Sequence, residues 1–300
     1  GYIAIKEPAF LPSITIGTIA LFLNCSKQFS RPINEIANLY GQILTATACA
    51  ERVFEILDSN NEIDEGKINI VEDTFKGNIE FKHVDFGYVD NQKVLKDFTL
   101  SVKPGQKIAL VGATGSGKTT VVNLLMRFYD VDSGEILLDG VNVNDIPKDD
   151  LRNTIAIVLQ DTVLFKDTIE NNLKYGNEEA TFEEVKQAGI LSNSNYFIKN
   201  LPNKYNTVLS EGGSNLSQGQ RQLLSIGRAI LADPKILILD EATSSVDTRT
   251  EKNIQDAMAN LMHNRTSLII AHRLSTIQDS DVIVVIDKGV IVEQGNHDEL

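Results

Sequence analysis

The chain has 300 residues, of which 42% are hydrophobic and 23% are charged, and its formal net charge is −13. This length and composition are ordinary for a globular protein with one large or two smaller domains. A free nucleic-acid-binding protein would normally present a basic face, so the acidic total argues against that class. Cys25 and Cys49 are far apart and lack the spacing of metal ligands, so we expect no disulfide framework and a reducing compartment.

The first 57 residues are expected to be largely helical. Residues 10–23 are mostly apolar but fall short of the roughly 20 residues that span a bilayer, although the apolar stretch could continue to Phe29. A buried core helix would explain this segment equally well. After Pro32, apolar residues recur at helical spacing, and a helix from about Ile14 to Leu57 would be roughly 65 Å long. That length suits a helix that leaves a membrane and continues into the cytoplasm better than the core of a small domain.

Residues 58–76 are acidic and rich in asparagine, which predicts a linker. The chain that follows, 77–300, is expected to be an α/β domain. Residues 79–88 partly alternate between apolar and polar, as in a strand of an antiparallel sheet with one solvent-exposed face. Five later runs are continuously apolar, as in strands that are buried on both faces, and helical stretches lie between most of them. These runs are 107–111, 155–158, 236–240, 267–271 and 282–287.

The stretch KIALVGATGSGKTT, residues 107–120, contains the phosphate-loop pattern G-x-x-x-x-G-K-[ST]. It follows an expected strand and opens an expected helix, a context that a chance glycine-rich turn would lack. Glycines let the backbone curl so that successive N–H groups face a phosphate, and the helix N-terminus adds partial positive charge. Lys118 is expected to reach the β- and γ-phosphates, and the Thr119 hydroxyl to bind Mg²⁺. The expected nucleotide-binding residues of the loop are Gly112, Ala113, Thr114, Gly115, Ser116, Gly117, Lys118, Thr119 and Thr120.

The run KILILDEATSSVD, residues 235–247, places two carboxylates at the end of an apolar strand. Asp240 would lie at the carboxyl edge of the sheet beside the phosphate loop, where it is suited to hold Mg²⁺. Glu241 follows directly and is suited to orient and deprotonate an attacking water. A solvated acidic pair at a strand end is the alternative, but the four apolar residues before it and the phosphate loop favour the catalytic interpretation.

The stretch NLSQGQRQLLSIGRAIL, residues 215–231, resembles the signature of ATP-binding cassette (ABC) proteins, whose usual form is L-S-G-G-Q. The phosphate loop, Gln160 in IVLQDT, the DEATSSVD run and His272 in IIAHRLST occur in the order of that family, and the resemblance covers residues 79–300. Residues 14–58 are similar to the last transmembrane helix and connecting helix of ABC exporters whose membrane domain is fused to the cassette.

The resemblance implies an α/β fold of the P-loop NTPase class. This ABC nucleotide-binding domain would have a RecA-like core, an antiparallel β subdomain and a helical subdomain that carries the signature, preceded by one transmembrane and connecting helix. Residues 1–57 would be the end of a transmembrane domain, residues 58–76 a linker, and residues 77–300 the nucleotide-binding domain.

The resemblance also implies roles for single residues. Tyr88 would stack on adenine, Gln160 would contact Mg²⁺ and the attacking water, and His272 would hydrogen-bond the γ-phosphate. The expected catalytic residues are therefore Glu241, His272, Gln160 and Lys118, and the expected metal ligands are Thr119, Gln160 and Asp240.

Other residues would act between two cassettes or toward the membrane domain. Asp247 would lie in the D-loop that crosses between the cassettes, and Glu211 would touch the coupling helices. Gln218 stands where the family usually has glycine, which puts symmetric self-pairing in doubt, so the second half-transporter could be the same chain or a different one. The signature residues that would act on nucleotide held by the other cassette are Ser217, Gln218, Gly219 and Gln220.

The last residues, GNHDEL, would literally be a retention signal of the endoplasmic reticulum. The resemblance instead implies that a helix begins here, with Asp298 and Glu299 in a first turn that favours negative charge. We therefore expect that the C-terminal end is truncated. The start at Gly1, with no signal peptide, is consistent with a piece of a longer chain.

Together these patterns predict part of an ABC exporter that binds ATP and Mg²⁺ and couples ATP hydrolysis to export of an unidentified substrate. The full-length protein would be multi-pass in the cell membrane, in contact with lipid, with its nucleotide-binding domain in the cytoplasm, and nucleic acid is not an expected partner. One alternative is a soluble ABC ATPase that remodels nucleic acid, which the acidic charge and residues 10–57 disfavour. Another is a non-hydrolysing half of an unequal transporter pair, which Glu241 and His272 disfavour.

Overall fold

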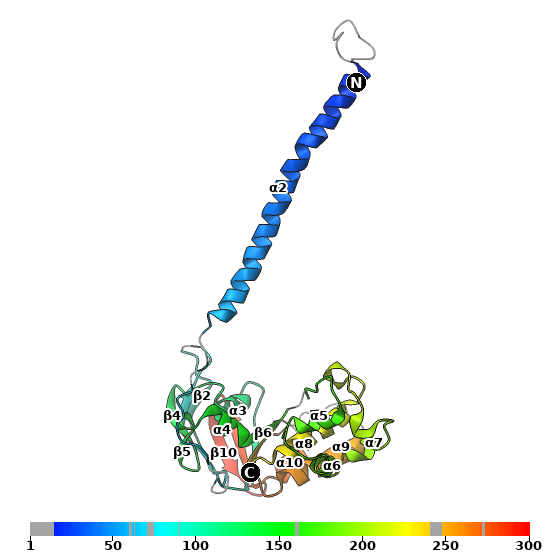
Figure 1. The fold of residues 1–300 in the computed structure, drawn as a ribbon. Helices are drawn as coiled ribbons and strands as arrows, with labels where there is room; N and C mark the ends of the chain where they lie inside the picture. Colours follow the sequence, from blue (N-terminus) through cyan, green and yellow to red (C-terminus); the bar gives the residue numbers. More distant parts are fainter. Residues whose placement is uncertain are drawn as a thin grey trace. The chain divides into compact units, whose positions relative to one another are not determined.

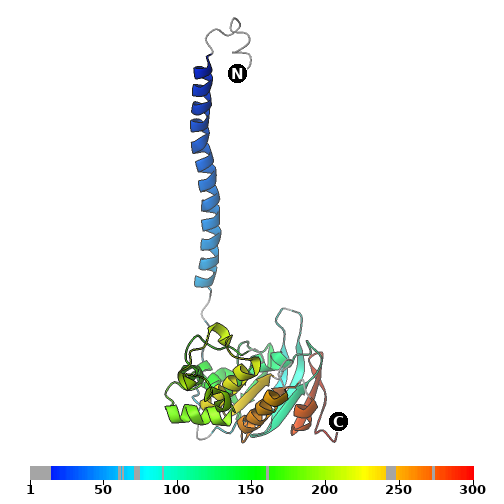
Figure 2. The same cartoon turned by 90° about the vertical axis from the view of Figure 1, so that its right-hand side faces the viewer.

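The computed structural model describes residues 15–59, 62, 64–70, 75–89, 91–159, 162–240, 248–271 and 274–300. The chain forms two compact units, Gly1–Ile63 and Asp64–Leu300. In Figures 1 and 2 the first unit contains one long helix, and the second is a folded body of helices and sheets.

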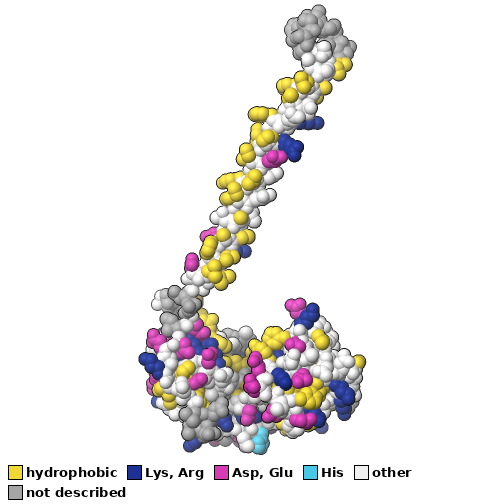
Figure 3. Space-filling model, viewed as in Figure 1, with side chains coloured by type: hydrophobic (Ala, Val, Ile, Leu, Met, Phe, Trp, Pro, Cys, Tyr) yellow, Lys and Arg dark blue, Asp and Glu magenta, His cyan; other side chains and the backbone are white. Residues whose placement is uncertain are grey.

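Helix α2 (Ile16–Leu57) is continuous over 42 residues, which confirms the predicted single helix. It begins with a reciprocal cap, because the Thr15 hydroxyl accepts from the Thr18 amide at 3.3 Å and the Thr18 hydroxyl accepts from the Thr15 amide at 2.8 Å. None of its residues is buried, and apolar side chains lie exposed along its length (Figure 3). In the part of the chain that the structure describes, no helix combines the length and the hydropathy that a membrane span requires.

One sheet of the second unit is antiparallel and has four strands in the order β2–β1–β4–β5. In β1 the buried residues Ile79 and Phe81 alternate with half-buried ones, as predicted for a strand with one exposed face. Phe81 packs edge-on against Phe98 of β2, with ring centres 5.5 Å apart. The strands are β1 (Ile79–Phe86), β2 (Leu95–Val102), β4 (Ser133–Leu138) and β5 (Val141–Asn142).

The second sheet has six strands in the order β10–β9–β3–β8–β7–β6. All neighbours from β9 to β6 are parallel, whereas β10 pairs antiparallel with β9. Every residue of β8 and the first four of β7 are buried, as their apolar runs predict. The carboxyl ends of the parallel strands meet at one edge, where open α/β sheets bind ligands. The strands are β3 (Lys107–Val111), β6 (Ile155–Val158), β7 (Ile236–Asp240), β8 (Thr266–Ile270), β9 (Val282–Asp287) and β10 (Val290–Gly295).

Two hydrophobic cores hold this unit together. One joins both sheets to helix α3 (Lys118–Leu125), and the other surrounds α8 (Gln218–Ala232) and reaches β7 and α9 (Thr248–Met262). In Figure 1 the four-stranded sheet and the helices around α8 lie at opposite ends of the unit. The other described helices are α4 (Lys148–Asn153), α5 (Ile169–Lys174), α6 (Phe182–Leu191), α7 (Asn195–Ile198), α10 (Leu274–Gln278) and the 3-10 turns Val143–Asp145, Lys204–Asn206 and Glu211–Gly213.

The chain's last residues form a hydrogen-bonded turn. Asn296 Oδ1 accepts from the amides of Asp298 and Glu299, at 3.0 Å each, and the Glu299 carboxylate accepts from the Asn296 amide at 2.9 Å. This reciprocal pattern is a capping box, as found at helix N-termini. The turn is therefore compatible with the predicted start of a helix at this point.

Candidate functional site

The phosphate loop, residues 112–117, joins the end of β3 to the start of α3. Two of its glycines have no room for a side chain. A Cβ on Gly112 would lie 2.2 Å from the Ile286 carbonyl oxygen. Gly117 caps α3 with a φ of 113°, which L residues rarely adopt, and a Cβ there would lie 2.8 Å from Leu95 Cδ2. The tight turn from strand to helix therefore requires glycine at both positions.

Lys118 directs its ammonium back into the phosphate loop. The residue is only 7% exposed, and Nζ donates to the carbonyl oxygens of Gly112 at 2.8 Å and Ala113 at 2.9 Å. Burial lowers the pKa of Lys118 below its ordinary value of 10.5, and the negative charge of Asp240 opposes that shift. A phosphate oxygen would be a stronger partner for this charge than two neutral carbonyls.

The loop also contains a hydroxyl that lacks a partner. Ser116 Oγ is buried and makes no hydrogen bond to any residue that the structure describes. A buried polar atom left unpaired costs roughly 1–3 kcal/mol, so a ligand oxygen at this point would be favoured. Among the described residues the tip of the loop is open, because a Cβ on Gly115 would meet none of their atoms within 4 Å. Ala113, Thr114 and Thr119 are exposed around this opening.

Asp240 lies at the same sheet edge as the phosphate loop. It is the last residue of β7 and is paired with Ile270 of β8, and Ile270 is in turn paired with Leu110 of β3. One strand thus separates Asp240 from the strand that leads into the loop. Its half-buried carboxylate is close enough to oppose part of the lowering of the Lys118 pKa that burial causes. The structure therefore brings together the two charged side chains that the phosphate-loop prediction requires.

Tyr88 belongs to a small aromatic cluster beside α3. Its ring meets those of Phe86 and Tyr129 edge to face, each with ring centres 5.0 Å apart. The Tyr88 hydroxyl donates to Thr120 Oγ1 at 3.3 Å and accepts from Asn123 Nδ2 at 3.0 Å. The side chain is nevertheless 46% exposed, so ring area remains available to a ligand. Thr120 is itself buried and contacts Tyr88, so the two predicted residues form one structural group.

The signature residues form the N-terminus of α8. Ser217 is the cap residue, Gln218 begins the helix, and Gly219 is buried. Ser217 and Gln220 are hydrogen-bonded to each other in a capping box. Arg221 ties the helix back to the preceding turn by donating to the Leu216 carbonyl at 2.8 Å. The result is a fixed helix N-terminus whose free amides are suited to an anion.

Four predicted residues, Gln160, Glu241, Asp247 and His272, lie outside the described residues. The strands β6, β7 and β8, which precede three of them in the chain, run parallel to β3. Their roles remain predictions. Glu211 is described and is exposed, in the turn Glu211–Gly213.

One feature of this unit was not predicted from the sequence. A groove of about 640 Å³ runs between the β6 region and α8, and Leu159 and Val163 on its wall flank the Gln160 segment. Arg228 holds this wall in place, because its guanidinium donates to the Asn172 and Val163 carbonyls at 3.0 and 3.1 Å and lies 5.0 Å from the centre of the Tyr175 ring. Burial lowers the pKa of Arg228 from its ordinary value. In the sequence, Arg228 is one polar residue of an amphipathic helix, and this pattern does not indicate its distant partners.

Comparison with known proteins identifies the family. The sequence profile described as "ABC transporter" matches residues 95–244. The chain belongs to the ABC transporter family. This ABC chain is 50% identical over 96% of its length to an uncharacterized ABC transporter ATP-binding protein, YfiC, of Bacillus subtilis. It is 47% identical over 100% of its length to a fatty acid ABC transporter ATP-binding/permease protein of Mycobacterium bovis. Each alignment covers 48% of the relative, so the chain spans about half the length of the curated relatives it matches.

A solved structure supports the same assignment. The ABC chain superimposes on a bacterial Atm1-family ABC exporter with ATP bound, with a TM-score of 0.75 and 36% sequence identity. The match covers 95% of this chain and 50% of that chain. The predicted α/β fold of an ABC nucleotide-binding domain, with an antiparallel sheet beside a mainly parallel one, is thereby confirmed. An ABC ATP-binding domain implies that ATP is bound, and the phosphate loop at Lys118 remains the predicted site for it.

Proposed function

We propose that this ABC chain is the ATP-hydrolysing part of an exporter of the cell membrane. The observation that carries the proposal is the Lys118 ammonium, buried in a glycine-lined loop and electrostatically coupled to Asp240 at the same sheet edge. The proposed role in transport is supported by the relatives, which are named as a permease and as an exporter. These names also favour a transporter over the nucleic-acid-remodelling alternative.

The reaction is in-line attack of water on the γ-phosphate of ATP. Lys118 and the amides of residues 112–117 would hold the phosphates and offset the negative charge that develops on their oxygens. Glu241 would take a proton from the attacking water as the new P–O bond forms and the bond to ADP breaks. Gln160 would orient the water, and His272 would hydrogen-bond the γ-phosphate. Catalysis would come mainly from positioning and charge stabilisation.

Mg²⁺ would neutralise charge on the β- and γ-phosphate oxygens. The residues that would hold it are Thr119, Gln160 and Asp240. Among the described residues, no group of three or more carboxylate, histidine or cysteine side chains is placed to hold a metal alone. Mg²⁺ usually takes one or two carboxylates together with substrate phosphates and waters, so an exposed threonine and one carboxylate fit this ion.

A second cassette would complete each site. The N-terminus of α8, with Ser217 at its cap, would face the γ-phosphate of nucleotide held by the partner, and Asp247 would lie between the two cassettes. The partner would be another ABC half-transporter. Gln218 replaces the usual glycine of the signature, so this partner could be a different polypeptide.

Two features of this chain would connect it to the transmembrane domain of the full-length protein. Helix α2 exposes apolar side chains along its length and would continue from the membrane domain in the full-length protein. The groove beside Leu159 and Arg228 would receive a helix of that domain, with Glu211 contacting it as well. We propose no transported substrate, because the residues that would select one lie mainly outside this chain.

Reconstituted full-length protein would test both halves of the proposal. We expect phosphate release from ATP by the wild-type protein and none by Lys118→Ala, because the variant lacks the charge that holds the phosphates. Equal rates for the two proteins would refute the proposed hydrolysis. ATP-dependent uptake of labelled fatty acid into inside-out vesicles would be a first transport assay, with Lys118→Ala as the control.

A further inference from the structure

Residues 64–70, which open the second unit, are docked on it through their backbone. The amides of Lys67 and Ile68 both donate to the Asp145 carbonyl oxygen, at 2.8 and 2.9 Å. The Ile70 side chain packs against the hydrophobic core of the two sheets. This segment follows α2 and the short stretch after it in the chain, so its docking fixes the point at which the second unit begins.

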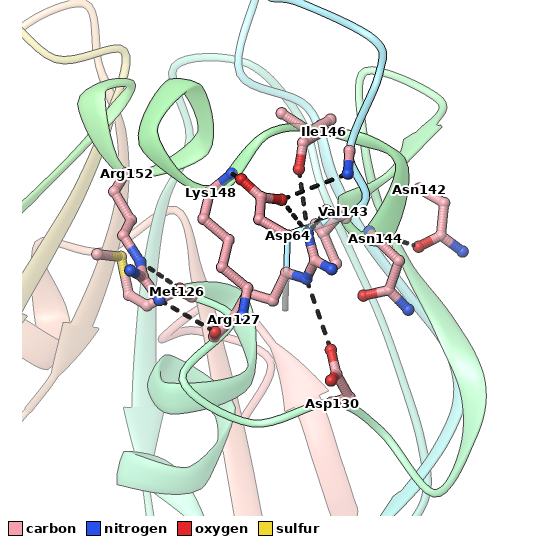
Figure 4. A network of polar contacts seen from close by, with 11 residues as sticks. Asp64, Met126, Arg127, Asp130, Asn142, Val143, Asn144, Ile146, Lys148 and Arg152 are labelled. Carbon is pink, nitrogen blue, oxygen red and sulfur yellow. Dashed lines mark hydrogen bonds and ion pairs between the residues drawn. The ribbon is translucent and has the colours of Figure 1, made fainter. Parts of the chain in front are cut away.

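Asp64 anchors the start of the docked segment (Figure 4). Its carboxylate accepts from the Lys148 amide at 3.0 Å and from the Gly66 amide at 3.3 Å. The Lys148 hydrogen bond lowers the pKa of Asp64, so the carboxylate is ionised near neutral pH. Gly66 fits tightly, since a Cβ there would lie 2.3 Å from the Ile146 carbonyl carbon. The anchor thus combines a charge with a close backbone approach that only glycine permits.

Arg127 is the buried cation that faces Asp64. Its side chain is only 8% exposed, and Nη1 lies 3.5 Å from Asp64 Oδ1. The same nitrogen donates to the Ile146 carbonyl at 3.1 Å and to the Val143 carbonyl at 3.5 Å. Nε lies 3.5 Å from the largely exposed Asp130 carboxylate and, within the described part of the chain, makes no hydrogen bond. Asp64 is therefore the less exposed of its two carboxylate partners.

The backbone of Arg127 ends the phosphate-loop helix. Its amide donates to the Leu124 carbonyl, and the Phe128 amide donates to the Asn123 carbonyl, which together form a Schellman motif after α3. Arg127 takes the left-handed position of this motif with a φ of 52°. Glycine would adopt this conformation without strain. The side-chain contacts of Arg127 must therefore offset a backbone cost.

The same helix end is tied to a second part of the site. Arg152 of α4 donates to the carbonyls of Met126 and Arg127, at 3.3 Å each. Helix α4 leads directly into β6, whose last residue, Val158, precedes the Gln160 segment. Helix α3 starts at Lys118 and spans eight residues, so one short rigid element joins the phosphate loop to this polar cluster.

We propose that Asp64 and Arg127 form a latch through which nucleotide in the phosphate loop tightens the docking of residues 64–70. This latch rests on the proposed function only because it takes ATP as the ligand of the phosphate loop. Nucleotide at Lys118 holds the first turn of α3, and a more rigid α3 holds Arg127 against Asp64. Linkage is reciprocal, so docking of the segment in turn favours nucleotide binding.

The latch also sets where along the chain the second unit begins. With the latch closed, the first side chain held by this unit is that of Asp64. Without it, the first amide held by the unit is that of Lys67.

Amide hydrogen exchange on the full-length protein tests the latch, because the Lys67 and Ile68 amides report docking directly. In the wild-type protein, a non-hydrolysable ATP analogue should slow their exchange about five-fold or more, alongside that of the phosphate-loop amides. Asp64→Asn should speed their exchange about ten-fold and remove the effect of the analogue, because the charge that faces Arg127 is lost. Glu65→Gln, which removes an exposed carboxylate one residue later, should behave as wild type.

Gly66→Ala provides a second way to undock the segment, since it leaves both charges in place and introduces a clash with the backbone of Ile146. It should also abolish the response of Lys67 and Ile68 to the analogue. The latch is refuted if the analogue slows the phosphate-loop amides and leaves Lys67 and Ile68 unchanged in the wild-type protein. It is also refuted if Asp64→Asn keeps the wild-type response. An intact response in a protein that moves no substrate would overturn the transport proposal and leave the latch standing.

Discussion

Ser217 and Gln220 cap the N-terminus of α8 reciprocally. The Ser217 hydroxyl accepts from the Gln220 amide at 3.3 Å, and the Gln220 side-chain oxygen accepts from the Ser217 amide at 3.0 Å. The serine oxygen is thus an acceptor in the cap, and its own hydrogen remains available for a phosphate oxygen. One residue can therefore both fix the helix N-terminus and bind an anion in front of it.

Substitutions at Ser217 should separate these two roles. Aspartate caps helices about as well as serine, but it adds a negative charge where the partner's γ-phosphate would lie. We expect Ser217→Asp to keep the thermal stability of the wild type and to lower ATPase activity at least about ten-fold. Ser217→Ala should lower activity and also lose about 1 kcal/mol of stability. Wild-type activity in Ser217→Asp would show that this helix end does not meet phosphate.

A mixed pair should show which nucleotide Ser217 acts on. If this chain carries Ser217→Ala and its partner is unchanged, nucleotide trapping should fail at the site built on the partner's phosphate loop. Nucleotide held by Lys118 of this chain should stay trapped. Loss at the Lys118 site instead would mean that the signature acts within its own chain. Equal turnover at both sites of a pure self-pair would argue against an unequal pair, which Gln218 suggests.

Tyr88 provides a test of adenine stacking. Tyr88→Ala should weaken ATP binding by roughly 1–2 kcal/mol, because an exposed ring face is lost. Tyr88→Phe should cost well under about 1 kcal/mol, since only the hydrogen bonds to Thr120 and Asn123 at a partly exposed site are lost. Calorimetric titration with ATP in a hydrolysis-deficient background would measure both. A Phe variant as weak as the Ala variant would show that the hydroxyl, through Thr120, matters more than the ring.

The strands and the phosphate loop could be predicted from the sequence because each is local. Apolar runs such as 236–240 predict buried parallel strands, whereas the capping box of Ser217 and Gln220 was found only in the structure. The strand order that places β8 between Asp240 and β3 was foreseen only as a shared edge of the sheet. The order of the strands depends on long-range pairing, which no short pattern encodes.

The polar contacts around Arg127 could not be predicted from the sequence. Asp64 lies in an acidic stretch that reads as a solvated linker, yet its carboxylate faces a buried arginine from a distant part of the chain. Nothing local distinguishes it from its neighbour Glu65, and both residues are exposed. Likewise, Arg228 contacts the Asn172 carbonyl of α5 and the ring of Tyr175, which directly follows α5. Such contacts depend on tertiary packing and become visible only in the fold.

Glu241 should carry the hydrolytic step. Glu241→Gln removes the proposed base and keeps a side chain of similar shape, so ATP binding should persist while turnover falls about 10²–10⁴-fold. Steady-state phosphate release and filter binding of ATP would measure the two effects separately. Asp240→Asn is the informative comparison, because it should weaken binding of ATP with Mg²⁺ as well. Near-normal hydrolysis by Glu241→Gln, with the partner cassette intact, would assign the base to another group.

Because of Lys118, the affinity for nucleotide should fall at alkaline pH. Burial lowers its pKa, so between the lowered value and 10.5 the unfolded chain binds more protons than the folded one, and folding stability rises with pH across that window. Phosphate favours the charged ammonium, so ATP binding should be accompanied by proton uptake in this window. The affinity for a non-hydrolysable ATP analogue should therefore fall as pH rises, starting below the pH at which an ordinary lysine titrates. Lys118→Arg, whose guanidinium stays charged, should bind more weakly at neutral pH but without this decline. Titrations of the full-length protein from about pH 7 to about pH 10 would decide. A flat profile for the wild-type protein would mean that the ammonium does not carry the binding, and a matching decline in Lys118→Arg would place the titrating group elsewhere.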